Sequence, residues 1–169
     1  MEVAKAAHLK FNYLLDFQTN PNLKSYEKTL MGQMCLKNTP NITLECGSHD
    51  SYQSQFVTEI VEAICSLLAA FSVIENQSSN KNNDHHYYTN TKKYRATNGG
   101  FINFHKQPGD TFSKGDTLYE TVYPDLNQHP DIVITSENGI VIKTSPTHIH
   151  WPGDEVMETV SQDNLIDLT

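Results

Sequence analysis

The chain has 169 residues, enough for one ordinary domain or two small ones, and 37% of them are hydrophobic, which allows a core. Its formal net charge is −8 and its one arginine is Arg95, so it lacks the basic face that a nucleic-acid-binding protein needs. No apolar run is long enough to span a bilayer, and the N-terminus lacks the pattern of a secretory signal. We therefore expect a cytoplasmic protein without a membrane partner, whose three cysteines are reduced.

The chain begins with a predicted helix and a predicted strand. Residues 1–10 can form a short helix, and the aromatic and apolar side chains of 11–17 predict a buried strand. The Asn-Pro-Asn sequence at 20–22 interrupts the pattern. A second helix is predicted over 25–37, with Ser25 as its N-cap.

A second strand and a longer helix follow. The β-branched segment 41–46 predicts a strand with a carboxylate, Glu45, at its C-terminal end. The next helix begins at Asp50 or Ser51 and reaches about residue 74, with an apolar stripe that we expect to pack on a sheet: Val57, Ile60, Ile64, Leu67 and Phe71. Strands alternating with helices indicate an α/β unit with a parallel sheet, although two strands are too few for a sheet that stands alone.

Composition divides the chain into four parts. Residues 1–75 form the predicted α/β unit, and residues 76–93 have the composition of a polar linker or flexible loop with little to bury. Residues 94–162 contain short strand patterns separated by glycine-rich turns, which predict a small all-β barrel or sandwich. Residues 163–169 form a loosely held tail.

An internal repeat lies within the predicted β-domain. The octapeptide Gly115–Val122 returns, with five of eight residues identical, as Gly153–Val160. Each copy describes a tight Gly-Asp turn that leads into a half-buried strand, so the domain contains two copies of one β-unit. This pattern resembles the biotinyl- and lipoyl-type sandwich domains, whose carriers display a lysine between the two halves. The connection 123–131 contains no lysine, so the resemblance implies the barrel-sandwich shape without the carrier function.

Glu45 is the first candidate for chemistry. A carboxylate at the C-terminal end of a parallel-type strand lies where ligand crevices form in open α/β sheets, although most such residues are simply solvated. The string Thr-Pro-Asn-Ile-Thr-Leu-Glu-Cys-Gly at 39–47 is followed by a long helix, a polar loop, Gly-Gly-Phe at 99–101 and a Gly-Asp-rich β-domain. This order resembles the C-terminal half of the succinylglutamate desuccinylase/aspartoacylase family, which are zinc hydrolases on a carboxypeptidase-like α/β fold.

The resemblance implies a function and a set of site residues. It implies an amide hydrolase that acts on an N-acyl amino acid, with a partial carboxypeptidase-like unit over residues 1–75. Glu45 matches the family's general base and acid, a role that requires a carboxylate within one hydrogen bond of the attacking water. Thr43 lies on the same side of the predicted strand and either shapes the site or packs. His49, just beyond the strand, can reach the mouth of a crevice.

The departures from the family pattern are equally specific. No histidine in the chain is followed three residues later by glutamate, and the arginines that the family carries before its catalytic glutamate are absent. A catalytic zinc needs three protein ligands, so we predict no metal ligand in this chain and zinc only in a complete family enzyme. We expect a truncated chain, a fragment or one half of a split enzyme, inactive alone and completed by a missing N-terminal half.

Two questions remain open, namely the role of the histidines and the functional class of the chain. His148 and His150 alternate along a predicted strand, a spacing that can bind metal, but without a third ligand we favour structural roles. His85 and His86, in the polar segment, are expected to be solvated. The second functional hypothesis is a non-catalytic binding or assembly module, which contacts a partner chain or copies of itself.

Overall fold

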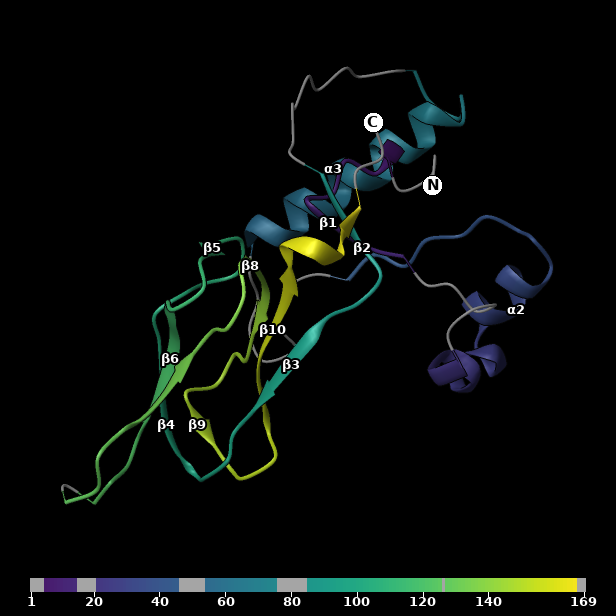
Figure 1. Ribbon diagram of the computed structural model, residues 1–169. Coiled ribbons are helices and arrows are strands. Elements are labelled where there is room, and N and C mark those ends of the chain that lie inside the picture. The colour runs from purple at the N-terminus through teal and green to yellow at the C-terminus, as the bar shows by residue number, and fades with distance from the viewer. Residues whose placement is uncertain (1–4, 15–20, 46–53, 76–84, 126, 167–169) are drawn as a thin grey trace. The chain divides into compact units, whose positions relative to one another are not determined.

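The computed structural model describes residues 5–14, 21–45, 54–75, 85–125 and 127–166 (Figure 1). The chain divides into two compact units, Met1–Tyr87 and Tyr88–Thr169. None of the helices in the described ranges is long and apolar enough to cross a membrane.

Two short strands of the N-terminal part lie side by side. Residues 5–6 are helical, and strand β1 (Phe11–Tyr13) is hydrogen-bonded to strand β2 (His86–Tyr88). Tyr87 and Tyr88 are both buried. The expectation that this segment has little to bury is therefore wrong for its described end, because two adjacent tyrosines supply the apolar surface of a strand. Residues 76–84 of the predicted linker lie outside the described ranges.

The helix predicted over 25–37 is divided in two. A 3₁₀ helix, η1 (Pro21–Lys28), is followed by α2 (Leu30–Leu36). The N-cap of α2 is Thr29 rather than Ser25, because the Thr29 hydroxyl accepts a hydrogen bond from the backbone N–H of Gly32 at 3.1 Å. The division thus follows from a side-chain cap inside the predicted helix.

The strand predicted over 41–46 does not form in its described part. Helix α2 stops where Asn38 adopts a left-handed φ of 54°, as the predicted helix end requires, and residues 41–45 then have no regular structure. The Asn41 side chain donates to Cys35 Sγ at 3.3 Å and to the Thr39 carbonyl at 3.1 Å. Asn41 therefore makes local turn-like bonds, and no described strand pairs with this segment, so the predicted parallel sheet does not form through these residues.

Helix α3 (Ser54–Ala70) forms close to its predicted position. Asp50 and Ser51, its predicted caps, lie outside the described residues, and Ser72 ends the helical region with a φ of 57°. The predicted stripe is only partly buried: three of its residues are exposed, namely Val57, Ile64 and Phe71. The better-buried side of α3 keeps Ile60 and Leu67 of the predicted stripe, but adds Phe56 and Ala63 in place of Val57 and Ile64. The expectation that the whole stripe packs on a sheet is therefore wrong for these three side chains.

The second unit consists of two four-stranded sheets, with the strand orders β3-β10-β8-β5 and β7-β6-β4-β9 (Figure 1). Its elements are β3 (Lys92–Arg95), β4 (Gly100–Phe104), β5 (Thr111–Phe112), β6 (Thr117–Val122), β7 (Asp131–Ile134), β8 (Gly139–Thr144), β9 (Ile149–His150), β10 (Glu155–Ser161), η2 (Gln162–Asn164) and β11 (Leu165–Ile166). All neighbouring pairs in both four-stranded sheets are antiparallel. The all-β prediction for this part of the chain is therefore confirmed.

The two halves of this unit are related by a pseudo-twofold exchange. Strand β4 pairs with β6 and with β9, and its counterpart β8 pairs with β10 and with β5. Strand β5 of the first half thus pairs within the sheet of the second half, and strand β9 of the second half pairs within the sheet of the first. A β-bulge interrupts β6 beside Leu118 and β10 beside Val156, at equivalent places in the repeat. The sequence repeat therefore corresponds to a repeated structure.

The Gly-Asp sequences form one turn three times, at Gln107–Asp110, Ser113–Asp116 and Trp151–Asp154. In each turn the third residue is a glycine with φ between 92° and 97°, and the aspartate N–H donates to the carbonyl of the first residue. The aspartate carboxylate in return accepts the N–H of that first residue, at 2.8 to 3.1 Å. This is a type II turn with a side-chain clamp, which explains the pairing of glycine with aspartate.

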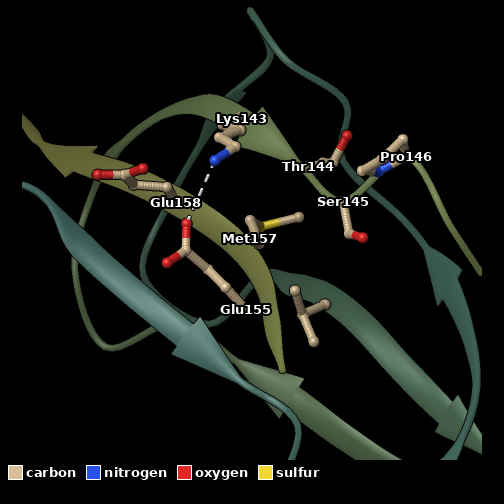
Figure 2. A pocket seen from close by; sticks show the side chains of 8 residues that line it. Lys143, Thr144, Ser145, Pro146, Glu155, Met157 and Glu158 are labelled. Carbon is tan, nitrogen blue, oxygen red and sulfur yellow. Dashed lines mark ion pairs between the residues drawn. The ribbon is translucent and has the colours of Figure 1, made fainter. Parts of the chain in front are cut away.

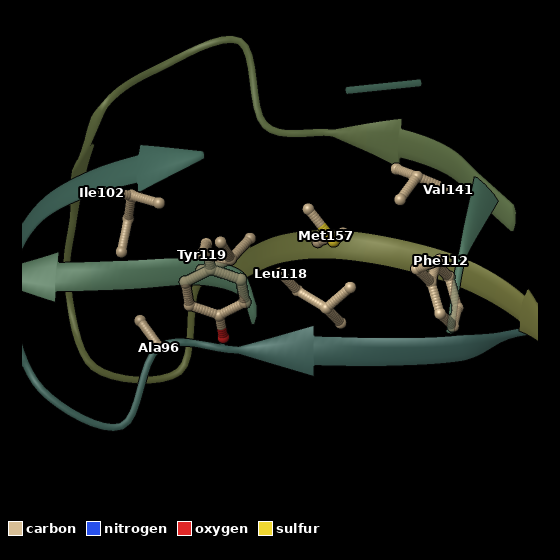
Figure 3. Packing of buried hydrophobic residues seen from close by; sticks show 8 residues of the cluster. Ala96, Ile102, Phe112, Leu118, Tyr119, Val141 and Met157 are labelled. Carbon is tan, nitrogen blue, oxygen red and sulfur yellow. The ribbon is translucent and has the colours of Figure 1, made fainter. Parts of the chain in front are cut away.

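The core lies between the two sheets (Figure 3). Both sheets contribute to it, with Leu118 and Tyr119 from β6 and Val156 and Met157 from β10. All four are buried, and they occupy equivalent positions of the repeat. The repeat is therefore also a repeat of core positions.

Candidate functional site

Glu45 ends the irregular segment that follows α2. Its side chain is exposed, so it meets the first requirement of a group that reacts with a bound molecule. The prediction that it lies at a strand end is not met, because residues 41–45 form no strand. Its role as general acid and base stays a prediction.

The two companions of Glu45 have different outcomes. The Thr43 hydroxyl donates a hydrogen bond to the sulfur of Met31 at 3.4 Å, which ties the segment to α2. Thr43 is itself exposed. His49 lies outside the described residues. A role for either in substrate binding stays a prediction.

The two histidines whose spacing can bind metal, His148 and His150, contact backbone carbonyls. His148 Nδ1 lies 2.9 Å from the Ile102 carbonyl, and His150 Nε2 lies 2.8 Å from the Thr147 carbonyl. His150 is buried while His148 is exposed, so the two do not share one face as the spacing suggested. His85, predicted to be solvated, is instead partly buried, with Nδ1 2.9 Å from the Leu9 carbonyl. These hydrogen bonds give the three rings structural roles.

The described residues do not fit a zinc site. Among them, no three side chains of the His, Cys, Asp or Glu type converge. A catalytic zinc requires three such ligands and one open position. We therefore derive no chemical step through a metal held by these residues.

A shallow depression of about 240 Å³ lies over β8 and β10 (Figure 2). Its charged centre is Glu155, which lies 3.0 Å from Lys93, 3.5 Å from Lys143 and 3.7 Å from Arg95. Burial would raise the pKa of Glu155, but the hydrogen bond from Lys93 and the charge of Lys143 together hold that pKa below its usual range. A carboxylate held in this way is a poor proton acceptor, which favours a structural ion-pair cluster over a catalytic site.

The sequence did not predict a polar cluster that Asn98, Tyr123 and Asp131 form beside the Gly-Gly-Phe segment. The buried Tyr123 hydroxyl donates to Asp131, and Asn98 Nδ2 lies 3.3 Å from both partners. The hydrogen bond to Asp131 raises the pKa of Tyr123, with burial as the second cause. The cluster thus joins the residue after β6, Tyr123, to the first residue of β7, Asp131. No local pattern indicates it, because its residues are 25 and 33 positions apart from Asn98.

Solved structures of the succinylglutamate desuccinylase/aspartoacylase family match the fold of this chain. The chain matches a succinylglutamate desuccinylase from Silicibacter sp. TM1040 with a TM-score of 0.76 at 12% identity, over 95% of this chain and 48% of that one. It matches the ectoine utilization protein EutE (DoeB) from Ruegeria pomeroyi with a TM-score of 0.76 at 15% identity, over 95% and 48%. A succinylglutamate desuccinylase/aspartoacylase from Rhodobacter sphaeroides gives 0.74 at 15% identity, over 95% and 49%.

These likenesses concern the fold. The chain spans slightly less than half the length of each of these three structures. No protein-family model matches the sequence, and no curated protein does. The structural match to this family confirms the resemblance that the order of motifs indicated.

Proposed function

We propose that the chain is part of a zinc-dependent amide hydrolase of the desuccinylase/aspartoacylase type, which removes an acyl group from an N-acyl amino acid. The observation that carries the proposal is the fold match over 95% of the chain to a desuccinylase structure. On this proposal, residues 1–75 belong to a carboxypeptidase-like α/β domain and residues 94–162 form a barrel-sandwich domain beside it. The zinc ligands lie outside the described residues, and the protein acts in the cytoplasm.

Glu45 is the residue that we propose for proton transfer. A carboxylate within one hydrogen bond of the attacking water accepts its proton, and the same group then delivers that proton to the leaving amine. The exposed side chain at the end of an irregular segment supports this role, because both steps need access to substrate. Thr43 fixes the segment through its bond to Met31.

The experiment begins with the DNA upstream of the codon for Met1. The proposal expects an open frame there that encodes a Gly-x-His-Gly-x-Glu-like segment and a later histidine. The extended chain is then expressed, and its zinc content and its hydrolysis of acetylaspartate and succinylglutamate are measured. We expect one zinc per chain, and a loss of kcat in Glu45→Gln of roughly 100-fold or more.

Glu59→Gln is the matched control, because Glu59 is also an exposed glutamate, on helix α3. It should leave kcat unchanged. A zinc-loaded extended chain whose turnover survives Glu45→Gln would contradict the proposed role of Glu45. An upstream sequence without ligands would contradict the hydrolase itself.

A second candidate is a non-catalytic binding or assembly module derived from the same fold. The observation that favours it is the apolar side of α3, where Val57, Val61 and Ile64 are exposed. The 169-residue chain would then bind no zinc and hydrolyse no substrate, but would be well folded and associated. Metal analysis and hydrolysis by the extended chain distinguish the two candidates, because only the hydrolase is expected to bind zinc and turn over substrate there.

A further inference from the structure

The two halves of the β unit present different surfaces at equivalent positions. In one sheet, β3 lies beside β10, with Lys93 opposite Glu158 and Arg95 opposite Glu155. In the other sheet, β7 lies beside β6 in the same register, with Ile132 opposite Glu120 and Ile134 opposite Thr117. Two basic side chains of the first outer surface are therefore replaced by two isoleucines in the second.

The charged surface is what a solvated sheet face requires. Glu155 is paired with Lys93, Arg95 and Lys143, and Lys93 also lies 4.0 Å from Glu158. Figure 2 shows Glu155, Glu158 and Lys143 together on this side of β8 and β10. Antiparallel sheets with one face in water normally alternate apolar and polar side chains in this way.

The second sheet has an apolar outer face, formed by Phe101, Val122, Ile132, Ile134 and Ile149. Phe101 lies directly opposite Val122 on one side and Ile149 on the other, so three neighbouring strands contribute one apolar row. Ile132 and Ile134 extend the face on β7, because residues two apart on a strand point to the same side. The five side chains are between 38% and 60% exposed.

The repeated strand pairing of the two halves gives this apolar face an internal comparison. The pair Ile140 and Val160 occupies the place of Phe101 and Val122, since the two strands pair at these residues in both halves. Ile140 is 6% and Val160 0% exposed, against 47% and 38% for their counterparts. The same apolar pair is thus covered in one half and open to solvent in the other.

The apolar face also carries one carboxylate, Glu120, which has two polar neighbours. Glu120 lies between the apolar row and Ile132, and its carboxylate accepts a hydrogen bond from Asn103 at 2.7 Å. His105 Nε2 lies 3.7 Å from the same carboxylate. A partner that covers this face therefore meets mainly apolar side chains, beside a carboxylate that already accepts a hydrogen bond.

We propose that the apolar face binds the same face of a second copy of this chain, so that two sheets stack and form a homodimer. The five side chains expose roughly 500 Å² of apolar surface, close to the largest patch that a typical monomer leaves open. A standard interface buries about 800 Å² on each partner, of which slightly more than half is apolar. The area thus matches what a stable dimer needs.

A second copy fits the face in geometry as well as in area. Stacked sheets pack about 10 Å apart with interdigitated apolar side chains, and two identical faces meet across a twofold axis. The proposal is independent of the hydrolase proposal, because it uses no residue of the candidate site. Strand β7, an edge strand of its sheet, would lie at the rim of the interface.

The test is sedimentation velocity on the full chain and on the double variant Ile132→Lys, Ile134→Arg. These substitutions copy the side chains of Lys93 and Arg95, and the first of them places a lysine opposite Glu120 just as Lys93 lies opposite Glu158. The variant is therefore expected to fold, which circular dichroism and urea unfolding verify. We expect a wild-type dimer and a dissociation constant at least about 100-fold higher in the variant, because each copy would have to bury two charged side chains in place of two isoleucines.

Ile64→Lys tests the competing surface, because Ile64 is 42% exposed and lies on the side of helix α3 that the assembly module would use. It should leave the dimer unchanged. A wild-type monomer throughout the measured concentrations would overturn the proposal and assign the face to a different partner. A folded double variant that remains dimeric, or dissociation by Ile64→Lys instead, would also overturn it.

Discussion

Replacing Gly115 by alanine tests whether the Gly-Asp turns depend on backbone conformation alone. Gly115 has a φ of 96°, and a Cβ atom added to it would meet nothing within 4 Å. An L-residue in the left-handed region costs about 1–2 kcal/mol, and the stiffer unfolded chain of an alanine variant returns about 0.4–1 kcal/mol. We therefore expect Gly115→Ala to lower the free energy of unfolding by about 1 kcal/mol.

The assay is urea unfolding at equilibrium, with two comparison variants. Gly115→Asn should cost less than Gly115→Ala, because asparagine tolerates this region of φ. Gly139→Ala should cost more than about 3 kcal/mol, because its Cβ would lie 2.2 Å from the Val160 carbonyl oxygen and 2.7 Å from Phe112. Equal losses for Gly115→Ala and Gly115→Asn would refute the reasoning, since the cause would then not be the backbone angle.

Two further predictions concern the core. Leu118→Ala removes a fully buried side chain and should lower the free energy of unfolding by about 2–5 kcal/mol, whereas Val57→Ala, on the exposed side of α3, should change it by at most about 0.5 kcal/mol. Burial raises the pKa of Tyr119 to about 12, with the charge of Tyr94 as the second cause, so the stability it contributes is complete below the unfolded value of about 10. This contribution to the free energy of unfolding is lost as the pH rises from about 10 toward 12. Over that pH range, urea unfolding should show a smaller loss of stability for Tyr119→Phe than for the wild type. An identical loss in both proteins would contradict the raised pKa of Tyr119.

The β unit could be predicted from the sequence because its signals are local. A Gly-Asp turn needs only four consecutive residues, and the alternation in Gly115–Val122 and Gly153–Val160 defines which side chains enter the core. The exchange of β5 and β9 between the halves could not be predicted, because strand pairing depends on residues far apart in the chain. The same holds for the contacts of Asn98 with Tyr123 and Asp131, which are 25 and 33 positions away.

The N-terminal part was predicted less well because its elements depend on partners. Residues 41–45 have a strand composition but no described neighbouring strand, and an isolated strand has no reason to stay extended. In α3, periodicity located the helix correctly, yet it could not indicate which side of a wide apolar arc would be covered. Glu45 was placed by motif order, and its proposed role awaits the test of Glu45→Gln.

The repeat separates what the β unit needs in order to fold from what its surface is free to change. The turn aspartates, the bulges beside Leu118 and Val156, and the core positions are kept in both halves, because each determines how a strand enters the sandwich. On the outside, Lys93 and Arg95 in one half stand where Ile132 and Ile134 stand in the other, and neither pair enters the core cluster. The core therefore does not require isoleucine at these two positions, and the proposed covered face would account for it. The fold therefore explains the similarity of the two halves, and the proposed contact with a second copy would explain their difference.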